Sequence, residues 1–365
     1  MKCVTKTSTV AYIELNRAAL KQNFEVLNKM FVQQNIEWCP VTKMLSGVDK
    51  YLELVVENGA KQIADARVSN LQKIKKIAPS VETIYIKPPA KQSIHRIVKF
   101  ADVSCNTEFQ TIKWLSEEAV KQNKTHGVII MIEMGDLREG VMGEDLLNFY
   151  KNIFELPNIT VKGIGTNLNC LHGVMPSQDK LVQLSLYEQL IQAKFESDIP
   201  WVSGGTSVVI PLLFRNQVPK GINHFRVGET LYFGNDLFSE SPIEGMRQDV
   251  IELCTEIIEI TEKPVVPVGE LEANPSGEHF EINEDDYGKV ANRAILDIGL
   301  LDVNPEYLMP LDKTVSISGA SSDMLIADIS DTKKNYKVGD LIRFKVKYMG
   351  AMRLMQSSYI EKRVV

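Results

Sequence analysis

The chain has 365 residues, of which 44% are hydrophobic and 24% are charged, which is the balance of a folded globular protein with room for two domains. Its net charge of −6 at pH 7 argues against nucleic acid as the main partner, and no apolar run approaches the roughly 20 residues that span a bilayer. The five cysteines are scattered and include no Cys-x-x-Cys pair, so we expect no disulfide framework, no metal site and a cytoplasmic protein.

The first part of the chain alternates short β-rich runs with longer helical patterns. A run at 11–15 is predicted to be an additional strand, after which Asn16 caps a helix. Eight further strands with helical patterns between them predict a (β/α)₈ TIM barrel, with residues 12–237 as the domain. A doubly wound open sheet is the main alternative, but no Gly-x-Gly-x-x-Gly follows an early strand. The eight predicted strands are 37–41, 62–64, 83–86, 102–104, 128–133, 161–166, 201–203 and 224–227.

Residues 238–365 have the pattern of a mainly-β domain, which residues 1–11 are expected to join. Strand-like runs are separated by turns, and the polar, acidic segment 274–288 predicts a loop. The predicted strands are 250–260, 293–298, 314–317, 325–329 and 341–348. We therefore expect an α/β chain in which a TIM barrel is followed by a C-terminal β domain.

Lys43 stands where the first barrel strand is predicted to end. The C-terminal ends of the strands form the active-site face of a TIM barrel. A lysine held among apolar neighbours loses part of its preference for the charged form, and it can then act as an amine nucleophile, as lysines that form Schiff bases do. Most lysines are solvated surface residues, so Lys43 alone does not identify a site.

The run Ser203-Gly204-Gly205-Thr206-Ser207 follows the seventh barrel strand. Glycines let the backbone approach a ligand, a helix N-terminus offers unpaired N–H groups, and TIM barrels often hold a phosphate with the loops after strands seven and eight. The alternative is an ordinary Gly-Gly turn in which Ser or Thr caps a helix.

A lysine and a phosphate site on one face suit a ligand with both an aldehyde and a phosphate, and pyridoxal phosphate is such a ligand. Arg226 lies in the eighth strand pattern, and an arginine that points into a barrel mouth needs an acceptor. The ring nitrogen of the cofactor would be one acceptor, and a carboxylate would be the more common one.

The chain resembles the alanine racemase-like (fold-type III) family of pyridoxal-phosphate enzymes, and within it the ornithine racemase branch of amino-acid racemases. The matching segments spread over nearly the whole chain, in order. They are Tyr12-Ile13-Glu14-Leu15-Asn16, Val41-Thr42-Lys43, Met134-Gly135-Asp136-Leu137-Arg138-Glu139-Gly140, Gly163-Ile164-Gly165-Thr166-Asn167-Leu168, Ser203-Gly204-Gly205, Gly221-Ile222-Asn223-His224-Phe225-Arg226-Val227-Gly228-Glu229 and Gly319-Ala320-Ser321-Ser322-Asp323.

The resemblance implies pyridoxal 5′-phosphate as the cofactor, Lys43 as the residue that holds it in a Schiff base, and a homodimer with shared active sites. Arg226 matches the arginine that faces the pyridine nitrogen; because an arginine stays protonated, the ring nitrogen should remain unprotonated. The residues implied to bind the cofactor are Lys43, Ser203, Gly205, Thr206, Ser207, Arg226, Gly228 and Tyr359, and those implied to bind substrate are Arg138, Asn167 and Asp323.

Three positions bear on the differences from the family. Gly47 stands where alanine racemases carry a tyrosine, and Asn167 replaces the family's histidine after the sixth strand. Racemisation needs a proton carrier on each face of the α-carbon. The candidate for the second carrier is Tyr287, because it is followed by a glycine, as the corresponding tyrosine of the family is. An exposed loop tyrosine is an equal interpretation, and Cys170 and His172 are the other candidates.

The resemblance implies racemisation of a free amino acid through removal and return of its α-proton. A diamino acid such as ornithine or lysine would need an acidic partner for its distal ammonium, which Glu284-Asp285-Asp286 could supply unless these acids are only solvated. An alanine, serine or broad-specificity racemase would need no such partner. A lyase or decarboxylase on a related barrel is a further alternative. A barrel protein that binds pyridoxal phosphate without catalysis is another, and the extra β domain argues against it.

Overall fold

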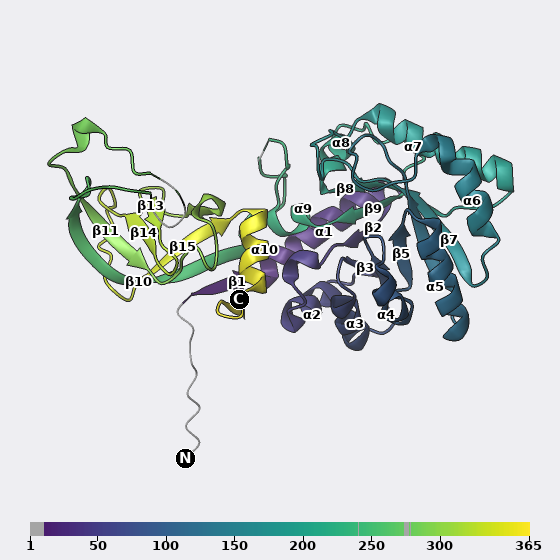
Figure 1. The fold of residues 1–365 in the computed structure, drawn as a ribbon, viewed down its shortest axis with the longest axis horizontal. Helices are drawn as coiled ribbons and strands as arrows, with labels where there is room; N and C mark the ends of the chain where they lie inside the picture. Colours follow the sequence, from purple (N-terminus) through teal and green to yellow (C-terminus); the bar gives the residue numbers. More distant parts are fainter. Residues whose placement is uncertain (1–10, 240, 274–276, 278) are drawn as a thin grey trace, which may run out of the picture. The chain divides into compact units, whose positions relative to one another are not determined.

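The computed structural model describes residues 11–239, 241–273, 277 and 279–365, and they form two compact units (Figure 1). Of the described residues, the barrel unit comprises those in 16–250 with Val364, and the β unit comprises 11–15 together with those in 251–363 and Val365. The sequence placed the boundary after Leu237, whereas the segment up to Val250 stays with the barrel unit. Asn23 explains this attachment, because its side chain donates to the carbonyl of Arg247 at 2.8 Å and accepts that residue's N–H at 2.6 Å.

The barrel unit contains eight parallel strands in the order β2-β9-β8-β7-β6-β5-β4-β3, and an isolated parallel bridge between Val41 and Ala64 joins the two ends of this order. Each strand overlaps one of the eight that the sequence predicted, so the TIM barrel is confirmed and the open sheet is excluded. The strands are β2 (Glu37–Pro40), β3 (Gln62–Asp65), β4 (Glu82–Tyr85), β5 (Val103–Asn106), β6 (His126–Met131), β7 (Ile159–Gly165), β8 (Trp201–Thr206) and β9 (His224–Val227).

Helices lie outside the strands of the barrel (Figure 1). The first begins where the sequence predicted, because the side chain of Asn16 accepts the N–H of Ala19 at 3.1 Å and caps it. The helices of this unit are α1 (Arg17–Gln33), α2 (Asp49–Glu57), α3 (Val68–Ile77), α4 (Ile94–Phe100), α5 (Phe109–Lys121), α6 (Leu146–Phe154), α7 (Gln178–Phe195), α8 (Ile210–Phe214) and α9 (Glu229–Phe233).

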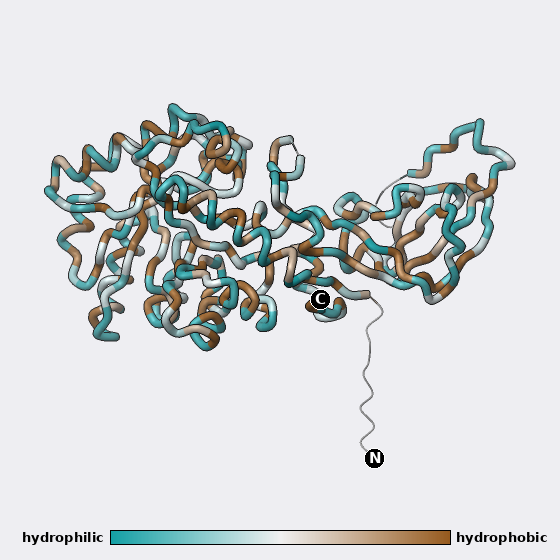
Figure 2. Tube along the Cα trace, turned by 180° about the vertical axis from the view of Figure 1, so that it is seen from behind, coloured by the Kyte–Doolittle hydropathy of each residue, from teal (hydrophilic) through white to brown (hydrophobic). Residues whose placement is uncertain are grey.

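Apolar side chains fill the inside of the barrel, and hydrophobic stretches run along its strands while many connecting loops are hydrophilic (Figure 2). This filling makes the barrel a packed core with its functional groups at the strand ends. The cluster consists of Cys39, Val41, Ala64, Ile84, Val103, Cys105, Ile129, Met131 and Trp201.

The β unit is built on one mainly antiparallel sheet whose longest strand is β10 (Ile251–Pro264). The predicted additional strand is confirmed as β1 (Tyr12–Leu15), which pairs with β10 and therefore belongs to this unit. Arg343 links three strands of the sheet, because its Nη2 contacts Glu252 at 2.8 Å and Glu14 at 2.5 Å. The remaining elements are β11 (Val290–Leu296), β12 (Leu308–Pro310), β13 (Ser316–Ala320), β14 (Leu325–Asp328), β15 (Leu341–Val346), α10 (Tyr348–Gln356) and β16 (Glu361–Val364).

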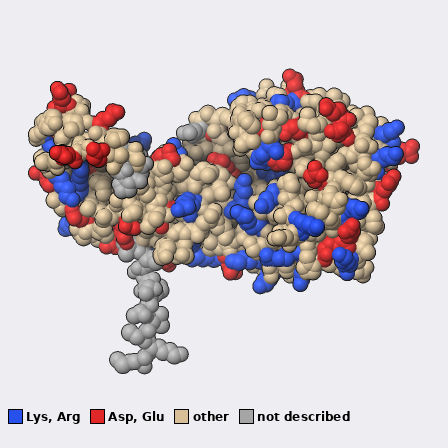
Figure 3. Space-filling model, in the orientation of Figure 1, with Lys and Arg blue, Asp and Glu red and all other residues tan. Residues whose placement is uncertain are grey.

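Among the described residues, no helix has the length and apolar character needed to cross a membrane. Acidic and basic side chains are interspersed over the visible face of each unit (Figure 3). This mixed surface agrees with the modest net charge of −6.

Candidate active site

Lys43 lies where the sequence placed it, beyond the C-terminal end of the first barrel strand, three residues after β2 ends at Pro40. Its side chain is exposed, while its neighbours Thr42 and Met44 are buried. The backbone before it is held on both sides, because Val41 N–H donates to Val227 at 2.8 Å and Thr42 N–H donates to Ala64 at 2.9 Å. The lysine therefore projects from a fixed strand end.

A buried carboxylate that sequence reasoning missed supports this strand end. Asp65, the last residue of β3, accepts the Thr42 hydroxyl at 2.7 Å, the Arg67 N–H at 2.8 Å and the Asn70 side-chain amide at 3.1 Å. Burial raises the pKa of Asp65, and the bonds from Thr42, Arg67 and Asn70 act in the opposite direction. Its position at the end of a barrel strand was the available signal.

The same cluster explains why Gly47 carries no side chain. Its φ is +71°, in the left-handed region, and a Cβ built there would lie 2.4 Å from Oδ1 of Asn70. The family's tyrosine at this place could not be accommodated without moving Asn70, which in turn bonds to Asp65. Gly47 also offers its carbonyl to Lys73 Nζ at 2.6 Å, which fixes the loop after the lysine.

Arg226 points into the barrel from β9, and its side chain is only 3% exposed. One Nη donates to the Ser203 carbonyl at 3.2 Å and contacts the Ser203 hydroxyl, and the other donates to the Thr166 carbonyl and to Asn167 Oδ1, each at 2.8 Å. Among the described residues, no hydrogen bond engages Arg226 Nε. Both Nη groups are therefore fixed, and Nε is the donor that remains for a ligand.

The predicted substrate residues are connected to this arginine. Asn167 donates from Nδ2 to Glu139 Oε1 at 2.6 Å, and Glu139 forms a two-point ion pair with its neighbour Arg138. The hydrogen bond to Glu139 raises the pKa of Arg138, so the guanidinium stays charged. The structure thus brings Arg138, Asn167 and Arg226 together, with Glu139 as a linking residue that the sequence did not single out.

The loop that follows β7 wraps around Asp136. The Asp136 carboxylate accepts the backbone N–H groups of Cys170 and Leu171 at 2.9 Å each and of His172 at 3.2 Å. The backbone carbonyl of Asp136 contacts His172 Nδ1 at 2.8 Å. Burial alone would raise the pKa of Asp136, but these backbone donors hold it below its usual value. Asp136 therefore fixes the loop that carries Cys170 and His172, the two other candidates for a proton carrier.

Most of the predicted phosphate loop, residues 203–206, belongs to β8, and the buried Ser207 directly follows the strand. Ser207 Oγ accepts the N–H of Gly228 at 3.3 Å and of Thr230 at 3.2 Å, so the predicted site residues Ser207 and Gly228 are neighbours. Thr206, which directly precedes Ser207, is half-buried. Ser203, by contrast, is fully buried and its hydroxyl meets Arg226.

The two glycines of this loop are required by packing. A Cβ on Gly204 would lie 2.7 Å from Ile222 Cδ1, and a Cβ on Gly205 would lie 2.1 Å from the Phe225 ring. Their small size therefore admits these apolar side chains, which the sequence could not reveal. Contact of Gly205 with a cofactor stays a prediction.

Three predicted site residues belong to the β unit and are not among those that the barrel unit brings together. Tyr287 follows a short turn and is 63% exposed, and Tyr359 is 81% exposed. Asp323 lies in the exposed turn between β13 and β14 and accepts the Ser322 hydroxyl at 2.8 Å. Their roles stay predictions.

Glu229 is a further acidic group of the barrel unit that sequence reasoning missed. It is half-buried directly after Gly228, burial raises its pKa, and the positive charge of Lys43 lowers it. Lys43 also acts on the Cys170 thiol: burial raises the pKa of Cys170, as do the nearby acids Asp136 and Glu139, whereas Arg138 and Lys43 lower it. In the described part of the chain, no group of three or more His, Cys, Asp or Glu side chains is placed to hold a metal ion.

Comparison with known proteins agrees with this geometry. Residues 15–236 match the family "Alanine racemase, N-terminal domain". The chain is 40% identical to an ornithine racemase of Acetoanaerobium sticklandii over 83% of this chain and 84% of that protein, and 28% identical to a lysine racemase of Thermotoga maritima over 95% and 96%.

Solved structures share the fold. An alanine racemase of Streptomyces coelicolor has a TM-score of 0.74 at 13% identity and covers 98% of each chain. An alanine racemase of Bartonella henselae with covalently bound pyridoxal phosphate has a TM-score of 0.71 at 16% identity and covers 98% of this chain and 99% of its own. The matched family model and the 40% identity over most of the chain show that the protein belongs to the alanine racemase family.

Proposed function

We propose that this protein is a pyridoxal 5′-phosphate-dependent racemase that acts on a free diamino acid, ornithine or lysine. The observation that carries the proposal is the placement of Lys43 and Arg226 in one barrel unit, each at the C-terminal end of a strand, together with membership of the family. The ornithine and lysine racemases to which the chain is similar support a diamino acid as the substrate.

The residues of the barrel unit fit the cofactor. Lys43 is an exposed residue that carries a primary amine, Arg226 keeps Nε as a donor for an unprotonated ring nitrogen, and the Ser207 hydroxyl, which accepts the N–H of Gly228, can donate its own hydrogen to a phosphate. When bound, pyridoxal phosphate supplies an electron-withdrawing ring that makes the α-hydrogen of an amino acid acidic.

In this proposal the chain's own side chains bind the substrate and move its proton. Arg138, kept charged by Glu139, receives the substrate carboxylate on the side of the site where Asn167 lies. Lys43 Nζ removes or returns the α-proton on one face of the α-carbon, and the Tyr287 hydroxyl serves the other face. Because Tyr287 belongs to the β unit, the proposal includes a homodimer in which active sites are shared, as the family resemblance implies.

The acidic turn before Tyr287 offers partners for a distal ammonium group. Glu284 and Asp285 are exposed, while Asp286 is paired with Lys289 at 2.9 Å. We therefore place the ammonium of the diamino acid at Glu284 or Asp285, and an alanine or serine racemase is the alternative that needs neither. The four free cysteines of the described chain support a reducing cytoplasm as the location.

The test is α-proton exchange in heavy water. The protein with added pyridoxal phosphate is mixed with single L-amino acids, including ornithine, lysine, alanine and serine, and followed by NMR with chiral analysis. We expect deuterium at the α-carbon and the D-isomer for ornithine or lysine. Lys43→Ala should abolish both, whereas Lys50→Ala, which changes an exposed lysine of α2, should not. Release of carbon dioxide or an aldehyde instead of a D-isomer would show a lyase and contradict the proposal.

A further inference from the structure

A chain of hydrogen bonds runs through the barrel from Arg226 toward the N-terminal ends of the strands. The Ser203 hydroxyl, which contacts Arg226, lies 2.7 Å from His224 Nδ1. His224 Nε2 lies 3.1 Å from Gln62 Oε1, and Gln62 Nε2 donates to Glu37 at 3.2 Å and to Glu82 at 3.0 Å. Side chains of five strands, β9, β8, β3, β2 and β4, thus form one connected path.

The bonding pattern fixes the tautomer of His224. Gln62 uses its amide nitrogen for the two carboxylates, so its oxygen faces His224, and an oxygen can only accept. His224 Nε2 must therefore carry the hydrogen, and in a neutral imidazole Nδ1 is then an acceptor. The Ser203 hydroxyl therefore donates its hydrogen to His224 Nδ1. The lone pairs of the Ser203 oxygen are then turned toward the Arg226 guanidinium.

A charged imidazole would not suit this place. His224 is fully buried in the same strand as Arg226, and burial first and the arginine second lower its pKa to about 3. If His224 were protonated, Nδ1 would donate to Ser203 and a second cation would stand beside the guanidinium. The neutral form alone satisfies every group in the path.

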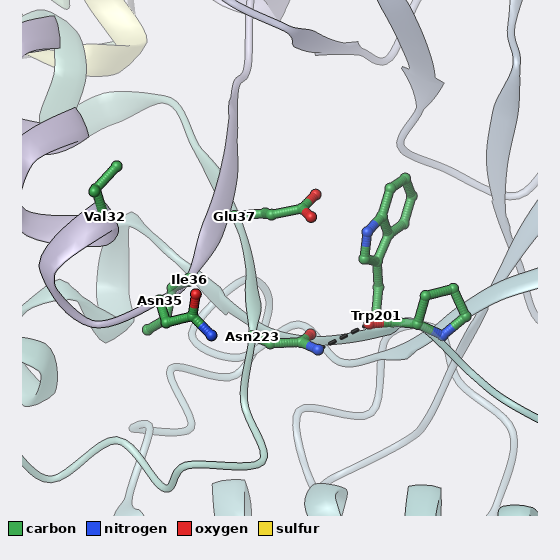
Figure 4. A pocket seen from close by; sticks show the side chains of 7 residues that line it. Val32, Asn35, Ile36, Glu37, Trp201 and Asn223 are labelled. Atoms are coloured by element: carbon green, nitrogen blue, oxygen red, sulfur yellow. Dashed lines mark hydrogen bonds between the residues drawn. The ribbon is translucent and has the colours of Figure 1, made fainter.

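The acidic end of the path opens at the N-terminal end of the barrel. A pocket of about 330 Å³ there is lined by Glu37 and Trp201, whose side chains both face its interior (Figure 4). Trp201 also stacks on His224, with ring centroids 4.7 Å apart and planes 18° apart. Glu37 can therefore be solvated, while the indole holds the imidazole plane in place and helps to exclude water from it.

We propose that neutral His224 is a positioning residue for Arg226, acting through the Ser203 hydroxyl to fix the guanidinium that faces the cofactor ring. The inference rests on the proposed function, because that ring contact is what makes the orientation of Arg226 important. His224 touches neither cofactor nor substrate in this arrangement.

The first test measures the tautomer without any reaction. Full-length protein with ¹⁵N-labelled histidine is studied by long-range ¹H–¹⁵N NMR, with and without pyridoxal phosphate, and His224→Gln identifies the signals. We expect His224 to carry its hydrogen on Nε2 and to stay neutral between pH 8 and pH 5. A hydrogen on Nδ1, or titration within this range, would overturn the proposal whether or not the protein racemises any amino acid.

The second test measures coupling. Ser203→Ala and His224→Phe should each weaken pyridoxal phosphate binding about tenfold and lower kcat more than they change KM, and the double variant should be no worse than either, because both interrupt one path. His224→Gln, whose amide oxygen can accept the Ser203 hydroxyl, should restore affinity to within about threefold of the wild type.

The matched control is His126, a second buried histidine that contacts a serine hydroxyl, Ser104, at 2.8 Å. Ser104 bonds onward to Asn106 instead of to an arginine. His126→Phe should lower thermal stability and leave cofactor affinity unchanged. Two results would show that His224 has only a structural role. In the first, the two single losses of cofactor affinity multiply to about 100-fold in the Ser203/His224 double variant; in the second, His126→Phe and His224→Phe lose the same cofactor affinity.

Discussion

Replacing Gly47 by alanine should destabilise the barrel unit through two separable effects. The residue has φ +71°, which costs an L-residue about 1–2 kcal/mol. The new Cβ would lie 2.4 Å from Asn70 Oδ1, and displacing a packed side chain costs about 1–3 kcal/mol. The free energy of unfolding should therefore fall by about 2–5 kcal/mol, and Asn70 should lose its bonds to Asp65.

Urea unfolding followed by tryptophan fluorescence suits this measurement, because Trp38, Trp114 and Trp201 all belong to the barrel unit. Gly59→Ala is the matched control, since Gly59 has φ +85° and nothing within 4 Å of a built Cβ, so it should lose only about 1–2 kcal/mol.

In an Asn70→Ala background the cost of Gly47→Ala should drop to that of the control, which gives a coupling energy of about 1–3 kcal/mol. The same cost of Gly47→Ala in both backgrounds, or a cost no greater than that of Gly59→Ala, would refute the argument that Asn70 excludes a side chain at this position. Racemisation should follow stability, with kcat/KM falling further in Gly47→Ala than in Gly59→Ala, because Gly47 lies in the loop after Lys43.

Three further outcomes are expected. Tyr287→Phe should leave cofactor binding unchanged and slow racemisation by at least about tenfold, since it removes a proton carrier; full activity in both directions would remove Tyr287 from the mechanism. Asp136→Asn should free the loop after β7, seen as faster amide hydrogen exchange at 170–174 and a higher KM, and unchanged exchange there would contradict the role of the carboxylate. Burial lowers the pKa of His126 to about 4, so its stabilising contribution is complete above pH 6.5 and is lost as the pH falls toward 4. In His126→Gln the free energy of unfolding should therefore fall less steeply on acidification, by about 1.4 kcal/mol per pH unit between pH 6.5 and 4. An unchanged slope would exclude a neutral buried His126.

The barrel could be predicted from the sequence because each strand is a short local pattern and each predicted strand overlaps an observed one. Lys43 could be predicted as well, since it needed only its place after such a strand. The β unit was harder: β13 starts later than predicted, and β12 and β16 escaped prediction because they are short strands whose pairing is non-local.

The connections among the site residues could not be predicted. Ser203 and His224 meet only because β8 and β9 are neighbours with inward-facing side chains, and Gln62 joins them only after the barrel closes. Gly205 shows the reverse problem, since a glycine required by packing against Phe225 has the same sequence pattern as one required by a ligand. The local sequence shows where each strand ends, whereas closure of the barrel decides which side chains touch.

The pairing of β1 imposes an order on biosynthesis. Tyr12–Leu15 is translated before the barrel unit, yet its partners β10 and β16 are translated only after that unit. The continuous segment 16–250 can fold as soon as it leaves the ribosome, whereas the sheet of the β unit is completed only when Glu361–Val364 emerges. Until β10 emerges, β1 has to stay unpaired and accessible to chaperones or to other chains, so a ribosome that stalls after residue 250 would release a folded barrel carrying an unsatisfied strand.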